Sequence, residues 1–157
     1  MGAKKGIPEN SSVVIPRLFC RDVEAEVEFC KRSFDAVDLG SRPGPDGAVA
    51  HALVTIGGAM VMIDAEWPGG FGHAPSRGAG SPVVLYVYVE DVDQAVERAL
   101  AQGARLLMSL ADQFWGDRIA WIEDTEGHVW TVASRIEETT EAERAGRWSE
   151  IVEKSKG

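Results

Sequence analysis

The chain has 157 residues, enough for about one domain, and its 45% hydrophobic content excludes a disordered chain. Its 25 acidic residues outnumber 16 basic ones, which gives a net charge of −9, so we expect no nucleic-acid partner. No apolar run reaches the roughly 18 residues of a membrane span, and residues 1–12 lack an apolar secretion segment. We therefore predict a cytoplasmic protein with no membrane partner.

The first half of the chain is predicted to contain a strand, a helix, an extra strand and a hairpin. Pro16 favours an edge position or a bulge for the first strand, because proline cannot donate a backbone hydrogen bond to a neighbour. Gly57 and Gly58 are typical of a two-residue turn. In chain order we expect a flexible arm over 1–12, a strand over 13–20, a helix from N-cap Asp22 to about residue 33, a strand over 36–41 and a hairpin over 47–64.

The second half repeats this order after a linker rich in glycine and proline. Its last segment is charged apart from one apolar face and is typical of an amphipathic helix. In chain order we expect the linker over 66–82, a strand over 83–89, a helix from N-cap Asp91 to about residue 102, a strand over 104–109, a hairpin of strands 119–123 and 128–133, and a helix within 136–157 capped at Thr139 or Thr140.

The two halves are related by a constant offset of 69 residues (91 − 22 and 127 − 58). Under this shift the predicted N-cap Asp22 falls on Asp91, and the turn residue Gly58 falls on Gly127. A shared offset across strand, helix and hairpin predicts a duplicated module. The division that follows is module one over 13–65, a linker over 66–82 and module two over 83–135, within one domain over 13–135 followed by a C-terminal helix over 136–157.

The stretches RDVEAEVEFCKRSF, PGPDGAVAHALVTIGG, VYVEDVDQAV, DQFWGDR and EDTEGHVW, set in two modules, resemble the vicinal oxygen chelate superfamily. Within it the chain is similar to glyoxalase/bleomycin-resistance proteins of the PhnB-like type. The resemblance covers roughly residues 13–135. It implies an α+β fold in which two repeated βαβββ modules form a curved eight-stranded cup. It also implies a homodimer and a small-molecule ligand in the cup.

Metal-dependent members of this superfamily hold an ion with side chains from the first and last strands of each module. Laid onto this sequence, that pattern falls on Ile15, Met62, Val84 and Thr131. None of these side chains offers the imidazole, carboxylate or thiolate that a divalent cation requires. We therefore expect no metal and no other cofactor.

Strand alternation predicts which side chains line the cup, once the resemblance has chosen the face. Pairing across the turn at Gly57 and Gly58 sets His51 opposite Asp64, and the repeat offset places Arg118, Ala120 and Ile122 on the cup face as well. Two tryptophans, Trp121 and Trp130, are expected to face the helices, and Trp67 and Trp115 to lie at the rim. The residues that we expect to bind a ligand are Arg17, Phe19, Met60, Met62, Tyr86, Tyr88, Trp115 and Thr131.

Two functions are consistent with this lining. The first is a metal-independent binding protein that sequesters an aromatic or cationic compound, which the acidic net charge and the rim tryptophans favour. The second is an isomerase or lyase acting on a small oxygenated substrate, with His51 as general base, Asp64 orienting it and Arg118 stabilising an oxyanion. Two other interpretations stay open: His51 and Asp64 as a solvated polar pair, and Arg118 as an ion-pair partner of Asp117 or Asp112. A protein with no small ligand, using its C-terminal helix as a contact surface, is a further alternative.

Overall fold

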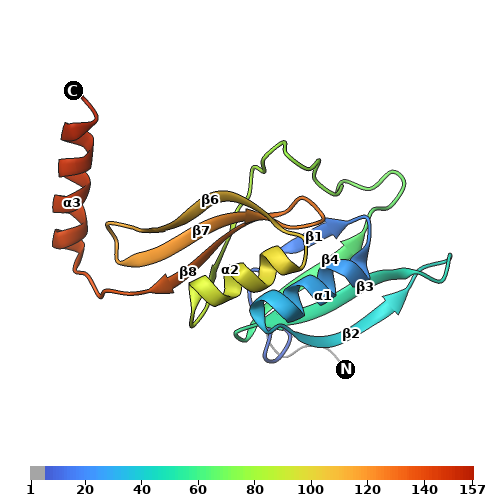
Figure 1. The fold of residues 1–157 in the computed structure, drawn as a ribbon. Helices are drawn as coiled ribbons and strands as arrows, with labels where there is room; N and C mark the ends of the chain where they lie inside the picture. The colour runs from blue at the N-terminus through green and yellow to red at the C-terminus, as the bar shows by residue number, and fades with distance from the viewer. Residues whose placement is uncertain (1–5) are drawn as a thin grey trace.

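The computed structural model describes residues 6–157. Part of the predicted arm, residues 1–5, lies outside this range. Two four-stranded sheets and three helices make up the fold, with an exposed connection over 66–84 (Figure 1). The predicted α+β architecture of two βαβββ modules with an added C-terminal helix is confirmed.

Module one forms a mixed sheet in the order β1-β4-β3-β2, with β1 parallel to β4 and the other neighbours antiparallel. The first strand is shorter than predicted, because Pro16 has no N–H and its carbonyl instead accepts a bond of 2.9 Å from Met62. The elements are β1 (Arg17–Cys20), α1 (Val23–Phe34), β2 (Val37–Pro43), β3 (Val49–Ile56) and β4 (Ala59–Ala65).

Module two repeats this topology in the order β5-β8-β7-β6, which confirms the duplication. The two first helices begin alike: Asp22 and Asp91 both have extended backbones, and the side chain of each accepts a bond from the amide three residues on. The elements are β5 (Leu85–Tyr88), α2 (Val92–Ala101), β6 (Arg105–Asp112), β7 (Asp117–Glu123) and β8 (Val129–Arg135).

The two modules share one hydrophobic core. Helices α1 and α2 contact each other along one side of the molecule (Figure 1), and each covers its own sheet. The ring of Phe34 at the end of α1 lies 4.9 Å from that of Trp130 on β8, so the core runs across the module boundary. The opposite surface of each sheet therefore points away from the core, and we call these surfaces open face one (module one) and open face two (module two).

The loop 124–128, between β7 and β8, ties the second module to the first. His128 Nε2 lies 2.8 Å from the carbonyl oxygen of Phe19, and Asp124 accepts a bond of 2.8 Å from Trp130 Nε1. Beside Asp124 lies the fully buried Glu26 of α1. Burial raises the pKa of Glu26 well above its ordinary value, and the nearby Asp124 carboxylate raises it further, so the Glu26 carboxyl keeps its proton.

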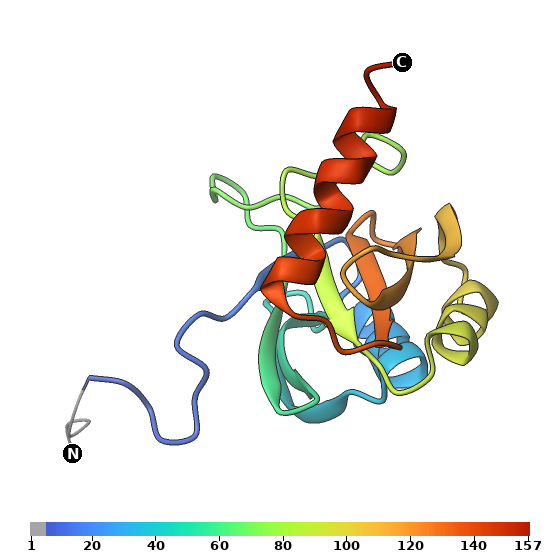
Figure 2. The same ribbon diagram turned by 90° about the vertical axis from the view of Figure 1, so that its left-hand side faces the viewer.

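Helix α3 (Glu141–Lys154) stands apart from the sheets (Figure 1 and Figure 2). It begins with a capping box in which Thr140 and Glu143 exchange side-chain and backbone hydrogen bonds, and none of its residues is buried. Thr140 is thus the cap, one of the two predicted positions. No helix within residues 6–157 is long and apolar enough to cross a membrane.

Candidate functional site

Open face one carries a histidine–aspartate–arginine cluster. His51 Nδ1 lies 2.8 Å from Asp64 Oδ1, and Arg17 Nε donates to Asp64 Oδ2 over the same distance. The Asp64 side chain is 4% exposed, whereas the Arg17 side chain is 57% exposed. The predicted pairing of His51 with Asp64 across β3 and β4 is confirmed. This bond to Asp64 raises the pKa of Arg17, so the guanidinium stays charged.

Apolar side chains surround this cluster. Met60 and Met62 lie on the same open face, as their pairing with Thr55 and Leu53 requires. The Arg17 guanidinium lies 5.4 Å from the centre of the Phe19 ring, which is a cation–π distance. A hollow of about 360 Å³ adjoins these two residues and is closed by the connection 66–84, through Trp67 and residues 70–72.

Open face two is organised around Asp117, which is fully buried. Its Oδ2 accepts bonds from the hydroxyls of Tyr86 (2.5 Å) and Tyr88 (2.7 Å) and from Trp115 Nε1 (2.9 Å). Its Oδ1 accepts a bond of 2.5 Å from Arg135 Nε. Burial alone would raise the pKa of Asp117, but these four donors outweigh it and hold the pKa below the ordinary value. Asp117 is therefore a charged acceptor at neutral pH.

The three aromatic residues bonded to Asp117 form what we call the aromatic platform: Tyr86, Tyr88 and Trp115. The two tyrosine rings are 5.3 Å apart at 55° to each other and are about half exposed. Trp115 Nε1 also lies 3.1 Å from the Tyr86 oxygen. Burial and the bond to Asp117 raise the pKa of Tyr86 above its ordinary value, so its proton stays on the oxygen and keeps the ring oriented.

The expectation that Arg118, Ala120 and Ile122 line the cup is wrong. In module one Ile56 pairs with Ala59, which leaves residues 57–58 in the turn, whereas Glu123 pairs with Val129 in module two. The longer loop slips β7 by one residue relative to the repeat, and a slip of one residue turns every side chain of a strand to the other face.

Several positions change face as a result. Ala120 and Ile122 are buried beneath the helices, and Trp121 pairs with Thr131 on open face two, where it is 39% exposed. The expectation that Trp121 faces the helices is therefore wrong, whereas that for Trp130, which is buried in the core, is confirmed.

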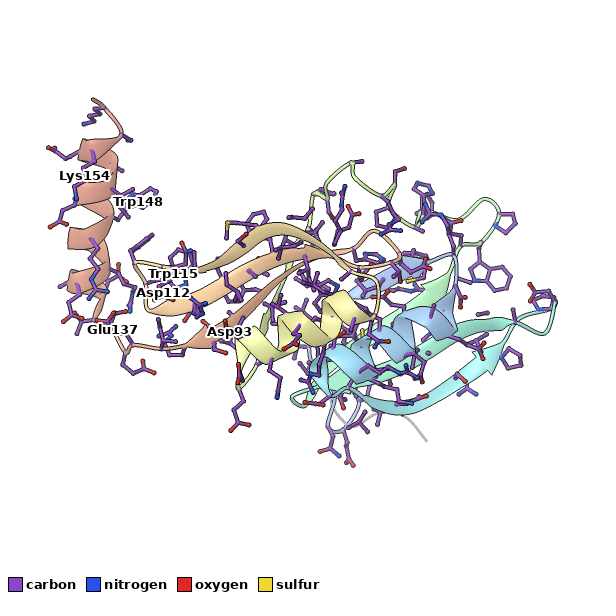
Figure 3. All side chains as sticks on the ribbon, viewed as in Figure 1. Asp93, Asp112, Trp115, Glu137, Trp148 and Lys154 are labelled. Carbon is purple, nitrogen blue, oxygen red and sulfur yellow. The ribbon has the colours of Figure 1, made fainter. Side chains whose placement is uncertain are left out.

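Arg118 lies on the helix side of its sheet, away from His51 and Asp64. It bonds both oxygens of Asp93 at the start of α2 (3.0 Å each) and Asp112 at the end of β6 (3.1 Å); Figure 3 labels these two acidic partners. These bonds, that to Asp93 first, raise the pKa of Arg118. The ion pair with Asp112 was one of the open interpretations, and Arg118 is not assembled with the histidine it was expected to assist.

The shorter turn of module one also leaves a hollow of about 800 Å³ between Gly57, the start of α2 at Asp91, and Arg118. In the other half of the repeat the loop 124–128 fills the equivalent space beside the start of α1. There Glu126 accepts bonds from the backbone amides of Arg21 and Asp22. This hollow is thus a product of the duplication and holds none of the residues predicted to bind a ligand other than Tyr88.

Two residues of open face two were missed at the sequence level. Asp117 had been considered only as an ion-pair partner of Arg118, and Arg135 had no assigned role. The strand alternation that would have found them depends on the register of β7, which the repeat misplaces by one residue. An acidic residue directly after the Trp115–Gly116 bend was the only sequence signal available.

The four positions that the superfamily uses for metal do not fit a metal here. Met62 and Thr131 lie on the two open faces, paired with Arg17 and Tyr86 in the neighbouring strands. Ile15 and Val84 precede β1 and β5. None of the four is a His, Cys, Asp or Glu, and within the described residues 6–157 no three such side chains gather closely enough to hold an ion.

Comparison with known proteins agrees with this fold. The model of the Glyoxalase/Bleomycin resistance protein/Dioxygenase superfamily matches residues 12–132. Uncharacterized proteins of Mycobacterium bovis and Mycobacterium tuberculosis are 39% identical over 126 residues, which is 78% of this chain and 83% and 74% of those proteins.

Among solved structures, TioX from Micromonospora sp. ML1 has a TM-score of 0.61 at 28% identity, over 80% of this chain and 100% of TioX. The PhnB protein from Bacillus cereus has a TM-score of 0.61 at 21% identity, over 78% of this chain and 99% of that one, which is a likeness of fold. Both the fold and the family match thus agree with the motifs of the sequence, and the chain belongs to the Glyoxalase/Bleomycin resistance protein/Dioxygenase superfamily.

Proposed function

We propose that this protein binds a small, flat aromatic molecule on open face two, without a metal and without changing it chemically. The observation that carries the proposal is the buried Asp117, whose four bonds fix the aromatic platform and Arg135 in one arrangement. A charged, fully buried carboxylate is costly unless it is fully paired, so such a group is retained where it orients its neighbours.

The platform suits a planar ligand, because its rings are already held in place before the ligand arrives. Side chains that are fixed in advance lose little conformational entropy on binding. Each aromatic contact of suitable geometry adds about 0.5–1.5 kcal/mol beyond burial, and a cation over a ring adds about 0.5–2 kcal/mol. The net charge of −9 favours a cationic ligand in addition. The bleomycin-resistance name of the superfamily supports the same class of ligand.

The test is titration of the purified protein with bleomycin and with acridine orange, a flat cationic dye, followed by tryptophan fluorescence and calorimetry. We expect stoichiometric binding that quenches Trp115, weakens at least tenfold in Tyr86→Ala, and is unchanged by EDTA. The matched control is His51→Ala on the other open face, which should bind as the parent does. Equal binding by Tyr86→Ala and the parent, or no binding of either probe, would overturn the proposal.

Two further predictions accompany this function. We expect a homodimer, in which a second copy covers open surface such as the half-exposed tyrosines and Trp121. We also keep the cytoplasmic location predicted from the sequence. Analytical ultracentrifugation tests the first prediction, and fractionation of the source cells tests the second.

A second candidate function is an isomerase or lyase centred on open face one. His51 and Asp64 support it, because a buried carboxylate 2.8 Å from a histidine nitrogen orients the ring and favours its charged form. Arg17 takes the place that was expected for Arg118, since it shares Asp64 and stays largely exposed. A suitable assay is NMR of α-proton exchange in dihydroxyacetone dissolved in D₂O. Exchange that disappears in His51→Ala and persists in Tyr86→Ala would establish this chemistry, and no exchange above buffer would exclude it for this substrate.

A further inference from the structure

Helix α3 has an apolar stripe with nothing packed on most of it. The stripe comprises Ala145, Trp148, Ile151 and Val152, which recur at three- and four-residue spacing on one side of the helix. Trp148 is 53% exposed and Ile151 is 42% exposed. In Figure 3 the Trp148 side chain points toward sheet two and Lys154 points away from it. The family match ends at residue 132, so α3 is additional to the shared domain.

The base of α3 is nevertheless fixed to the body of the protein. The amides of Ile136 and Glu137 both donate to the carbonyl of Gly116 (2.9 and 3.1 Å). Arg147 bonds both oxygens of Glu137 and the carbonyl of Phe114, whose ring lies 5.5 Å from that of Trp148. The helix therefore projects in a defined direction, and its free stripe is an oriented surface.

The charges of α3 are arranged antisymmetrically about its midpoint. Residues 141–156 contain eight charged side chains, and each has a partner of opposite sign at the same distance on the other side of the point between Trp148 and Ser149. These partners are Glu141 with Lys156, Glu143 with Lys154, Arg144 with Glu153, and Arg147 with Glu150.

Two copies of such a helix laid antiparallel match each other in charge along their whole length. The same arrangement brings Ala145 of one copy opposite Val152 of the other and sets the two Trp148 side chains near the centre. In the described part of the chain Glu150, Glu153 and Lys154 make no ion pair, so the outer half of the helix has charges to offer. A foreign partner would not account for this self-complementarity.

We propose that α3 packs antiparallel against α3 of a second copy of this chain. A helix of 14 residues is about 21 Å long, and one such pair falls short of the roughly 1,200 Å² that a stable interface buries. The contact therefore belongs to a larger interface, continuous with open face two through Phe114 and Trp115 at the base of α3, and here the inference rests on the proposed homodimer. Its part is to fix the mutual orientation of the two copies.

The test uses two charge-reversed variants of the full chain. Lys154→Glu with Lys156→Glu makes both ends of α3 negative, and Glu141→Lys with Glu143→Lys makes both ends positive. We expect each variant alone to dimerise at least tenfold more weakly than the parent in sedimentation analysis, and a 1:1 mixture to form a heterodimer within about threefold of the parent. General charge repulsion cannot mimic this result, because one variant raises the net negative charge and the other lowers it.

Circular dichroism checks that α3 stays helical, since Glu143 belongs to the capping box. If that variant loses helicity, Glu141→Lys alone mixed with Lys156→Glu alone serves the same purpose, with a smaller expected effect. Three outcomes would overturn the proposal: a monomeric parent at 100 µM, unchanged dimerisation of the variants, or a mixture no tighter than its components. Acridine orange binding measured in parallel separates this failure from failure of the proposed function, because a variant can bind the dye and still lose its dimer.

Discussion

Replacing Asp117 by asparagine tests the organisation of open face two most directly. An asparagine keeps the shape of the side chain but carries one acceptor oxygen and one NH₂ donor in place of two charged oxygens. Its oxygen will turn toward the three donors Tyr86, Tyr88 and Trp115, because that side of Asp117 accepts the larger number of bonds. The NH₂ group then meets Arg135 Nε, so two donors face each other where a bond of 2.5 Å had been.

The expected loss follows from those bonds. A hydrogen bond to a charged group contributes about 1.5–3 kcal/mol, and the Arg135 bond is lost outright while three others become weaker neutral bonds. Arg135 is 35% exposed and can turn to water, which reduces the loss at that position. We therefore expect Asp117→Asn to lower the free energy of unfolding by about 2–3 kcal/mol, which corresponds to about 4–12 °C in Tm for a chain of this size.

Urea unfolding at pH 7, with Asp112→Asn as control, measures this loss. Asp112 is 62% exposed in its ion pair with Arg118, so its replacement should change stability by less than about 0.5 kcal/mol. Because the folded pKa of Asp117 is lowered, its stabilisation is complete above the unfolded pKa of about 3.9 and is lost as the pH falls toward the folded pKa. The gap between parent and variant should therefore narrow below about pH 4. A loss under 0.5 kcal/mol at pH 7 would refute the organising role of Asp117.

Three further predictions concern the tyrosines, the buried acid and the mount of α3. Tyr86 and Tyr88 are the only tyrosines, so phenolate absorbance at 295 nm should show a component above the ordinary tyrosine range that disappears in Tyr86→Phe and moves down in Asp117→Asn. The folded pKa of Glu26 is raised, so stability should fall as the pH rises above about 4.3, by up to about 1.4 kcal/mol per pH unit, and Glu26→Gln should flatten that slope in urea midpoints. Gly116 has φ +100° and a Cβ there would meet the Glu137 carbonyl, so Gly116→Ala should cost at least about 1–3 kcal/mol, whereas Gly146→Ala, in open space, should stabilise by about 0.5–1 kcal/mol.

The fold could be predicted in detail because its signals are local. Asp22 and Asp91 mark the helix starts through a side-chain bond within one turn, and Thr140 does the same for α3. The tight turn at Gly57 and Gly58 fixes the register of the first hairpin, since both residues have positive φ and the loop has no freedom to slip. The pairing of His51 with Asp64 follows from that turn, which explains why it was predicted correctly.

The second hairpin could not be predicted to the same accuracy. Its loop carries Asp124, Glu126 and His128, each of which bonds atoms of module one or of the loop itself. Those tertiary contacts decide where β7 leaves the loop, and a repeat offset holds no information about them. The glycines at both ends keep the offset of 69 residues while the strand between them slips by one, so the sequence pattern looks intact.

This slip is also the reason why the two open faces differ. Module one has a histidine on the central strand β3 at the position where β7 has Ile119, so the His51–Asp64 pair has no counterpart in module two. Module two has Asp117 where β3 has Val49, so the aromatic platform has no counterpart in module one. A duplicated module with an unchanged register would present two similar surfaces. One residue of slip instead gives the chain a basic, histidine-containing surface and a separate aromatic surface, and each can be altered without removing a bonded partner of the other.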